Sequence, residues 1–244
     1  MSLVTTIYTI LFYAATVILL VGVARKVYSY ASIPAPLKIP TTPAPTTTSG
    51  VAFRMLREVV LFESLFKSNK WTWLFGWTFH MAMWAVLIRH LRYFIAPEID
   101  ILTMFQPVGM YAGFGMVIGL LGLFGRRIFV ERVRYISAPS DYLMLLLIIG
   151  IGITGLLMSF VEHTDIIALK AFTLGLVYFD IQPMPEDPVL MVHLASVALL
   201  MIIFPISKLL HAPGIFFSPT RNQADNPREK RHLSPWAAKL EAKN

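Results

Sequence analysis

Long apolar runs separated by short polar segments dominate this chain. A helix that crosses the roughly 30 Å hydrocarbon core of a bilayer needs about 20 largely apolar residues. Five runs are long enough, at about 3–24, 71–95, 104–125, 142–161 and 189–210. The pattern therefore predicts an all-α membrane protein with five transmembrane helices in a bundle.

The first cytoplasmic segment expected from this pattern, 26–70, has two parts. Pro34–Gly50 is rich in Pro and Thr and is expected to be a linker, because this composition neither forms a helix nor packs a core. Residues 51–68 then show an amphipathic helical pattern. Such a helix lies at the membrane interface or docks a partner.

The remaining segments complete the predicted organisation. Residues 1–25 form a retained helix, since no basic start or Ala-x-Ala-like site marks a signal peptide. Residues 71–213 form a four-helix core, and its outer segment at 162–188 contains the apolar stretch Ile166–Phe179, which is too short to span and predicts a re-entrant or surface helix. A basic tail follows at 214–244.

Composition narrows the class of protein. The 244 residues are 56% hydrophobic and only 14% charged, with a mean hydropathy of +0.65, which excludes an ordinary soluble domain. The chain has no cysteine, so it can form no disulfide, no zinc–thiolate site and no iron–sulfur cluster. Any redox chemistry therefore needs a different cofactor.

The net charge is +7. The positions of the charged residues along the chain predict its orientation in the membrane, and they do not indicate nucleic-acid binding. Basic residues gather in 25–70, in 126–134 and from Lys208 onward, whereas acidic residues gather in the other connections. The acidic set is Glu98, Asp100, Glu162, Asp165, Asp180, Glu186 and Asp187. The positive-inside rule then predicts an outer N-terminus and a cytoplasmic C-terminus in the cytoplasmic (inner) membrane.

Four of the six histidines lie in or at the ends of two of the five runs. His80 and His90 are ten residues apart on the second, and His193 and His211 are eighteen apart on the fifth, which is five whole helical turns. Because these helices run antiparallel, the natural pairs are His90 with His193 near the outer surface and His80 with His211 nearer the cytoplasm. Each pair can hold the iron of one haem b from opposite faces.

Other readings of the histidines stay open. A lone membrane histidine commonly makes an interhelical hydrogen bond, and zinc or copper is also possible, although these two runs offer no Asp, Glu or Cys in their interiors. Arg89 and Arg92 flank His90, so they either pair with haem propionates or extend to lipid headgroups.

The inner pair requires a bend. The spacing on the second helix is about 15 Å and that on the fifth about 27 Å, which straight rods do not match. Pro205 removes a backbone hydrogen bond just before His211 and is expected to kink the fifth helix there.

This arrangement resembles the gamma subunit family of respiratory nitrate reductase, a dihaem cytochrome b. The shared features are H80-MAMWAVLIR-H90, and His193 with the His211 of FPISKLLHAP at 204–213. The resemblance covers 71–125 and 140–213. The long Pro/Thr linker, ESLFKSNKW at 63–71 and the large outer segment look more like the M subunit of the dissimilatory sulfite reductase-linked Dsr complex (DsrM), and more distantly the membrane subunit of heterodisulfide reductase.

The resemblance implies cofactors and partners. These are two haem b groups, menaquinone or ubiquinone, a cytoplasmic iron–sulfur subunit related to heterodisulfide reductase, and other membrane and periplasmic subunits of a complex in sulfur metabolism. The nitrate reductase family places a lysine of the loop between helices two and three at its quinol site. This chain has Glu98 and Asp100 there. His163, with Glu162, Asp165 and Lys170 nearby, is the candidate substitute, although a solvated loop histidine is the plainer interpretation. His232 receives no role.

The sequence thus predicts an electron-transfer subunit of an oxidoreductase complex in a lipid bilayer, with the direction of electron flow open. One alternative is a gamma-type cytochrome b of a nitrate reductase-like or other quinol-linked oxidoreductase. Another is a haem-free membrane anchor whose histidines only form hydrogen bonds. A transporter would need a polar midplane pathway or broken helices in repeated halves, which the sequence does not show.

Overall fold

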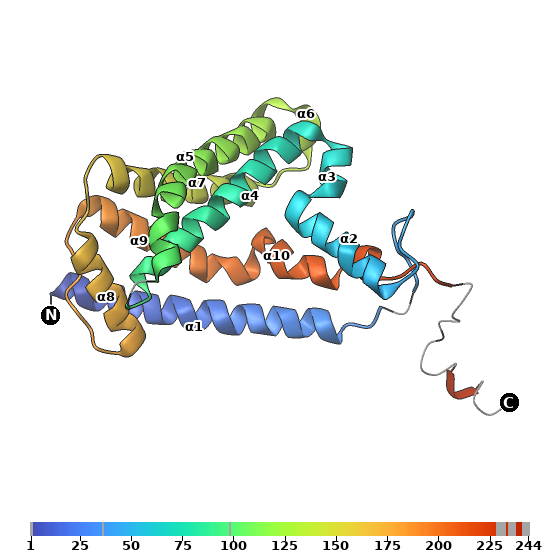
Figure 1. The fold of residues 1–244 in the computed structure, drawn as a ribbon, viewed down its shortest axis with the longest axis horizontal. Coiled ribbons are helices and arrows are strands. Elements are labelled where there is room, and N and C mark those ends of the chain that lie inside the picture. The colour runs from blue at the N-terminus through green and yellow to red at the C-terminus, as the bar shows by residue number, and fades with distance from the viewer. Residues whose placement is uncertain (1, 36, 98, 228–232, 234–237, 241–244) are drawn as a thin grey trace. The chain divides into compact units, whose positions relative to one another are not determined.

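The computed structural model describes residues 2–35, 37–97, 99–227, 233 and 238–240, and every regular element within these ranges is helical (Figure 1). The all-α prediction is therefore confirmed. The α-helices are α1 (Leu3–Ser32), α2 (Thr48–Leu61), α3 (Glu63–Ser68), α4 (Lys70–His90), α5 (Asp100–Phe129), α6 (Glu131–Tyr135), α7 (Pro139–Phe160), α8 (Ile166–Tyr178), α9 (Pro188–Ile203), α10 (His211–Gly214) and α11 (Pro219–Asn222). Short 3-10 turns cover Leu91–Tyr93, Phe204–Ile206, Lys208–Leu210 and Ile215–Phe217.

Four helices in the described part of the chain are long and apolar enough to cross a membrane. They are α1, α5, α7 and the helical stretch Pro188–Ile206, and they coincide with four of the five predicted spans. The fifth predicted span forms α4, whose 21 residues give about 32 Å of rise. It carries four tryptophans, two histidines and two other basic residues, which lower its hydropathy. The crossing of α4, and with it the five-span count, stays a prediction.

The chain divides into two compact units, and the first comprises residues 1–18 and 65–203. In it α4 packs along α5, α5 along α7, and α7 along α9 (Figure 1). Glycines make the α4–α5 contact close. A Cβ added at Gly119 would stand 2.8 Å from both the Phe75 oxygen and the Phe79 nitrogen, and one at Gly122 would clash with the Phe75 ring. Small residues thus let these backbones approach, as is common between membrane helices.

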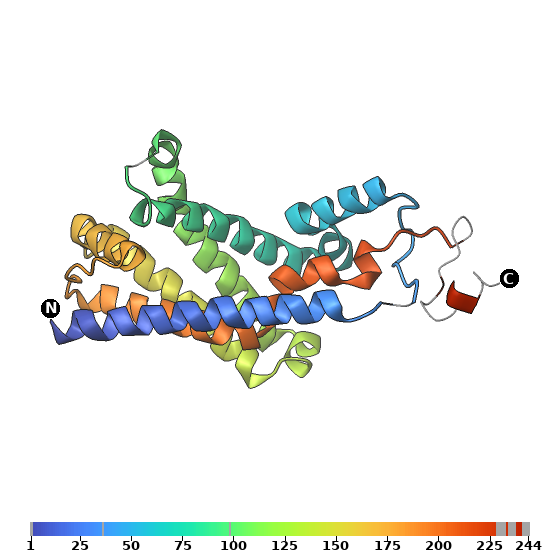
Figure 2. The ribbon, with the colours of Figure 1, turned by 90° about the horizontal axis from the view of Figure 1, so that it is seen from below.

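The first half of α1 belongs to the same unit and is fixed by two tyrosines. The Tyr8 hydroxyl donates to the Met191 carbonyl at 2.8 Å, and the Tyr13 hydroxyl donates to the Leu176 carbonyl at 3.0 Å. Tyr13 also stacks on Phe179, with ring centroids 5.6 Å apart. The predicted short apolar helix after residue 162 is present as α8, which lies beside the first turns of α1 in both ribbon views (Figure 2).

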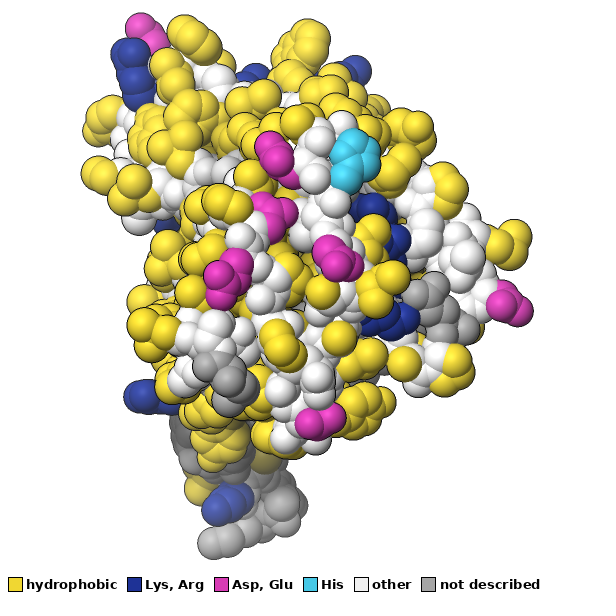
Figure 3. Space-filling view, turned by 90° about the vertical axis from the view of Figure 1, so that its left-hand side faces the viewer, with side chains coloured by type: hydrophobic (Ala, Val, Ile, Leu, Met, Phe, Trp, Pro, Cys, Tyr) yellow, Lys and Arg dark blue, Asp and Glu magenta, His cyan; other side chains and the backbone are white. Residues whose placement is uncertain are grey.

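The end of this unit that carries α8 is also where acidic side chains gather. Glu162, Asp165, Asp180 and Glu186 are exposed there. Figure 3 looks onto this end and shows acidic groups spread over a largely hydrophobic and uncharged surface. The side of the membrane on which these connections lie stays a prediction from the sequence.

The second unit comprises residues 19–64 and 204–244. The single helix predicted over 51–68 is instead broken at Phe62, which adopts a left-handed conformation with φ of 51°. Ion pairing and capping stabilise the break, since Arg57 pairs with Glu63 and the Glu58 carboxylate accepts the Ser64 backbone N–H. A helical pattern does not reveal such a turn, because both halves keep the same apolar periodicity.

The Pro/Thr-rich linker is non-helical only as far as Thr47, and Thr48–Gly50 already form the first turn of α2. It is not a free tether. The Thr41 N–H donates to the Thr220 carbonyl at 2.9 Å, and the Asp225 N–H donates to the Pro45 carbonyl at 2.8 Å. Backbone pairing with the tail therefore fixes a segment whose composition predicted only flexibility.

The predicted fifth helix is also interrupted. The α9 helix ends at Ile203, a 3-10 turn holds Pro205, and Ser207 is extended with φ of −102° and ψ of 170°. The expectation of a kink at Pro205 is confirmed, but the continuous helix that was to carry both His193 and His211 is wrong. Proline lacks an N–H and clashes with the preceding turn, and the Ser207 hydroxyl then accepts the Leu209 N–H to start a new turn.

Candidate functional site

Two histidines from different helices face one another in the first unit. His90 is the last residue of α4, and His193 lies on the second turn of α9 with only 7% of its surface exposed. Their ring centroids are 6.5 Å apart and the ring planes differ by 12°. The structure thus brings together the two residues that the sequence assigned to the outer pair.

A hydrogen bond sets the tautomer of each of these rings. The His90 Nδ1 lies 2.7 Å from the Val86 carbonyl, which can only accept, so Nδ1 carries the proton. The His193 Nδ1 lies 2.9 Å from the Thr154 hydroxyl, which itself donates to the Gly150 carbonyl at 2.8 Å and therefore accepts from the ring. In both residues the lone pair is left on Nε2, the arrangement typical of metal-binding imidazoles.

The separation of the rings suits a metal centre between them. An imidazole nitrogen binds a transition metal at roughly 2 Å, so two rings on opposite sides of one ion have centroids roughly 6 Å apart. The observed separation of 6.5 Å is close to that value. Gly155 of α7 lies against this site, because an added Cβ there would sit 3.5 Å from the His193 Cε1.

Arg89 and Arg92 lie beside this pair and have unused donors. The Arg89 Nη1 is 3.4 Å from the Ser159 hydroxyl, and the Arg92 Nη1 donates to the Gln106 side chain at 2.9 Å. The Nε atoms of both are buried and have no hydrogen-bond partner among the described residues. Leaving a buried donor unpaired is costly, so these guanidinium groups suit an anionic group such as a carboxylate of a bound cofactor.

The other two predicted ligands lie in different units. His80 is in the third turn of α4, where its Nδ1 is 2.7 Å from the Gly76 carbonyl. His211 begins α10 in the second unit, with its Nδ1 3.0 Å from the Lys208 carbonyl. In both residues Nδ1 therefore donates to a backbone carbonyl, as it does in His90. Their pairing stays a prediction from the sequence.

The predicted quinone residues have separate surroundings. His163 is exposed in the turn before α8, with φ of 51° and its Nδ1 3.0 Å from the Val161 carbonyl. Lys170 lies on α8 itself. The Asp165 carboxylate accepts hydrogen bonds from the N–H groups of Ile167 and Ala168. It therefore caps the N-terminus of α8. Glu98 and His232 lie outside the described residues.

Sequence reasoning missed Thr154. Its hydroxyl is the polar group that orients His193, and it lies in the middle of the apolar α7 helix. A threonine within an apolar span is the only signal the sequence offered. It is a weak one, because such hydroxyls commonly bond back to their own helix.

Known proteins match most of the chain. The model of the nitrate reductase gamma subunit family matches residues 63–226. A protein of Archaeoglobus fulgidus named Hdr-like menaquinol oxidoreductase cytochrome b-like subunit is 35% identical over 92% of this chain and 81% of its own length. A protein of the same name from Archaeoglobus profundus is 31% identical over 92% of this chain and 80% of its own length.

The family match includes α4, α5, α7 and α9, together with all four histidines discussed above. It also extends past the core into the second unit, through α10 and α11. The chain belongs to the nitrate reductase gamma subunit family.

Proposed function

We propose that this chain is the dihaem cytochrome b subunit of a membrane redox complex, which exchanges electrons between the quinone pool and a cytoplasmic iron–sulfur subunit. The observation that carries the proposal is the His90–His193 pair, with near-parallel rings 6.5 Å apart and both Nδ1 atoms engaged. A haem held by these two histidines would supply one-electron transfer.

The chain's own residues supply binding and orientation. Val86 and Thr154 fix the tautomers of His90 and His193, so each ring would hold a haem iron through Nε2. Arg89 and Arg92 would neutralise the propionates with their unpaired Nε donors. Two imidazoles alone give a bare zinc ion only half of its usual four ligands, and no group of three or more His, Cys, Asp or Glu side chains in the described part of the chain could complete them.

The second haem is assigned to His80 and His211. The support is the sequence pattern on the second and fifth predicted helices and the shared use of Nδ1 as a donor to a backbone carbonyl. The assignment requires α4 to span the bilayer, which its 21 residues allow. With the N-terminus outside, the outer pair lies near the outer surface of the cytoplasmic membrane and the inner pair nearer the cytoplasm.

The names of two relatives support the proposed quinone and the proposed kind of complex. Both curated relatives are named as subunits of an Hdr-like menaquinol oxidoreductase. We assign menaquinone as the exchangeable substrate and a heterodisulfide reductase-like iron–sulfur subunit as the partner, within a Dsr-type complex of dissimilatory sulfur metabolism. The basic cytoplasmic segments would dock this subunit. His163 and Lys170 are the proposed outer quinone contacts, since a histidine there can take up or release quinol protons.

Variants that each remove one histidine test whether His90 and His193 hold the same haem. His90→Ala and His193→Ala should each remove the same low-spin b-type signal from the reduced optical spectrum and the EPR spectrum of the purified full chain, because both rings hold one iron. His163→Ala is the matched control, as it removes an exposed histidine that no haem assignment uses. Retention of that signal in both ligand variants would refute the assignment and favour a haem-free anchor.

A further inference from the structure

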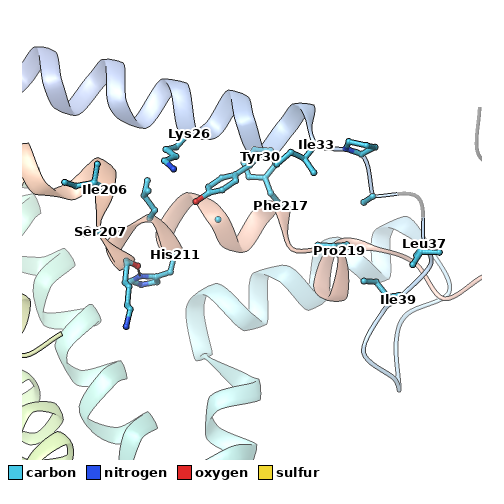
Figure 4. A pocket seen from close by; sticks show the side chains of 15 residues that line it. Lys26, Tyr30, Ile33, Leu37, Ile39, Ile206, Ser207, His211, Phe217 and Pro219 are labelled. Atoms are coloured by element: carbon cyan, nitrogen blue, oxygen red, sulfur yellow. Dashed lines mark hydrogen bonds between the residues drawn. The ribbon is translucent and has the colours of Figure 1, made fainter. Parts of the chain in front are cut away.

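A pocket of about 890 Å³ lies in the second unit, between the last turns of α1 and the segment 206–219 (Figure 4). Most of its wall is apolar, with Ile33, Leu37, Ile206, Leu210 and Phe217 among the lining residues. Its polar groups come from Lys26, Tyr30, Ser207, Lys208 and His211. None of the described residues that line it is acidic, so the described lining combines an apolar wall with basic side chains.

Three residues at four-residue spacing on one face of α1 build this pocket. Gly22 meets Pro205 closely, since an added Cβ would stand 2.5 Å from the Pro205 Cβ. Two turns later Tyr30 packs on Phe217, with ring centroids 6.0 Å apart. Lys26 lies between these two contacts and its side chain extends toward the segment that carries His211, as Figure 4 shows. The two contacts hold the backbone segments together, and the space between them is left for a ligand that Lys26 can reach.

The length of α1 sets the depth of Lys26 in the membrane. The helix has 30 residues, or about 45 Å of rise, whereas the hydrocarbon core is about 30 Å thick. Its only charged residues are Arg25 and Lys26, which follow 22 uncharged residues from Leu3 to Ala24. Lys26 therefore lies at the level of the lipid headgroups, with Tyr28 and Tyr30 at the usual position of interfacial aromatic residues.

We propose that this pocket binds one anionic phospholipid, with the headgroup phosphate at Lys26 and the first part of an acyl chain along the apolar wall. Basic pockets at the end of a membrane helix attract acidic headgroups, and the described lining brings no carboxylate next to Lys26 that would repel a phosphate. The Tyr30 hydroxyl, directed into the same space, supplies a hydrogen-bond donor. The headgroup is assigned to Lys26 and not to His211, which the proposed function assigns to the inner haem.

Lipid retention in native mass spectrometry tests this site. The full chain would be purified in detergent, equilibrated with phosphatidylglycerol or phosphatidylcholine, and measured as the wild type, Lys26→Gln and Arg25→Gln. Arg25→Gln is the matched control, because it removes the same charge from the same turn but changes a residue outside the lining. The wild type and Arg25→Gln should retain phosphatidylglycerol in preference to phosphatidylcholine, and Lys26→Gln should retain it about fivefold more weakly.

A third variant separates the pocket from surface charge. Ala35→Trp keeps every charge and fills the lining at an exposed loop position, so it should also reduce phosphatidylglycerol retention. Equal retention of the two lipids by the wild type, or equal losses in Lys26→Gln and Arg25→Gln, would overturn the proposal. So would retention of a neutral quinone analogue with the same dependence on Lys26, which would make the pocket a quinone site.

Discussion

At the scale of single residues, the geometry of the His90–His193 pair depends on how each imidazole is oriented. The histidines could be predicted from the sequence, because polar rings in two apolar runs are costly unless they have partners. Thr154 could not, since its role follows from the way α7 packs on α9 and brings its hydroxyl to 2.9 Å from the His193 Nδ1. Arg89 and Arg92 were named with two possible roles, and their buried, unpartnered Nε atoms favour the propionate role.

Thr154→Val should raise the midpoint potential of one of the two haem transitions that the proposed function predicts. The hydroxyl accepts a hydrogen bond from the His193 Nδ1 and would make the ring a better electron donor to a haem iron, which would stabilise the oxidised state. A potentiometric titration of the purified chain measures both transitions. Thr9→Val is the control, because Thr9 is a buried threonine whose hydroxyl donates to the Thr5 carbonyl of its own helix. Unchanged potentials in Thr154→Val would show that this hydroxyl does not tune the site.

At the scale of elements, the apolar runs predicted the positions of the long helices well, but they did not predict where helices are interrupted. The ends of α5 and α7 fall within four residues of the predicted spans, because hydrophobic length decides where a membrane helix can form. The breaks at Phe62 and at Pro205–Ser207 depend on individual contacts, such as the Glu58 carboxylate with Ser64. The periodicity of the sequence does not record those contacts.

The α4–α5 contact predicts an asymmetric response to two similar substitutions. Gly119→Ala should lower the free energy of unfolding by about 1–3 kcal/mol, because its Cβ would meet backbone atoms of Phe75 and Phe79 at 2.8 to 3.0 Å, which cannot move without shifting a helix. Gly125→Ala in the same helix meets only the Phe129 ring at 3.9 Å and should be neutral. Thermal unfolding in detergent measures both. Equal stability of the two variants would mean that the helices do not pack this closely.

The start of α9 should respond to acid. Asp187 accepts the N–H groups of Val189 and Leu190, and the hydrogen bond from the Thr164 hydroxyl is the largest of the effects that hold the pKa of this carboxyl below its ordinary value. A lowered pKa stabilises the fold above the unfolded pKa of about 4, and this contribution is lost as the pH falls through the folded value.

Asp187→Ala should therefore cost about 1 kcal/mol near neutral pH, the usual loss for a helix cap. The difference from the wild type should vanish in strong acid, where the native carboxyl is also protonated. Unfolding curves recorded across the acid range would show the two proteins converging. Glu186→Ala is a suitable control, since Glu186 is an exposed neighbour outside these hydrogen bonds. A difference that persists unchanged in acid would contradict the role given to the carboxylate.

At the scale of the whole molecule, the sequence predicted the class of protein and its family. The match over 63–226 agrees with the resemblance seen in the histidine spacing and extends beyond it at both ends. What the sequence could not show is that residues 19–64 and 204–244 form a unit of their own, in which the Pro/Thr linker pairs with the tail. Backbone hydrogen bonds between segments far apart in the sequence cannot be predicted from amino-acid composition. The spacing of five whole helical turns between His193 and His211 does not apply for a related reason. The helix between them is interrupted at Pro205 and Ser207.

The haem content of the purified chain tests the central claim most directly. The pyridine haemochrome spectrum of the full chain, divided by its protein concentration, gives the number of haem b groups per polypeptide. The two histidine pairs predict a ratio close to two, falling to one in His193→Ala. A wild-type ratio of one would contradict the inner pair, and a protein that carries no haem b would contradict the cytochrome assignment itself.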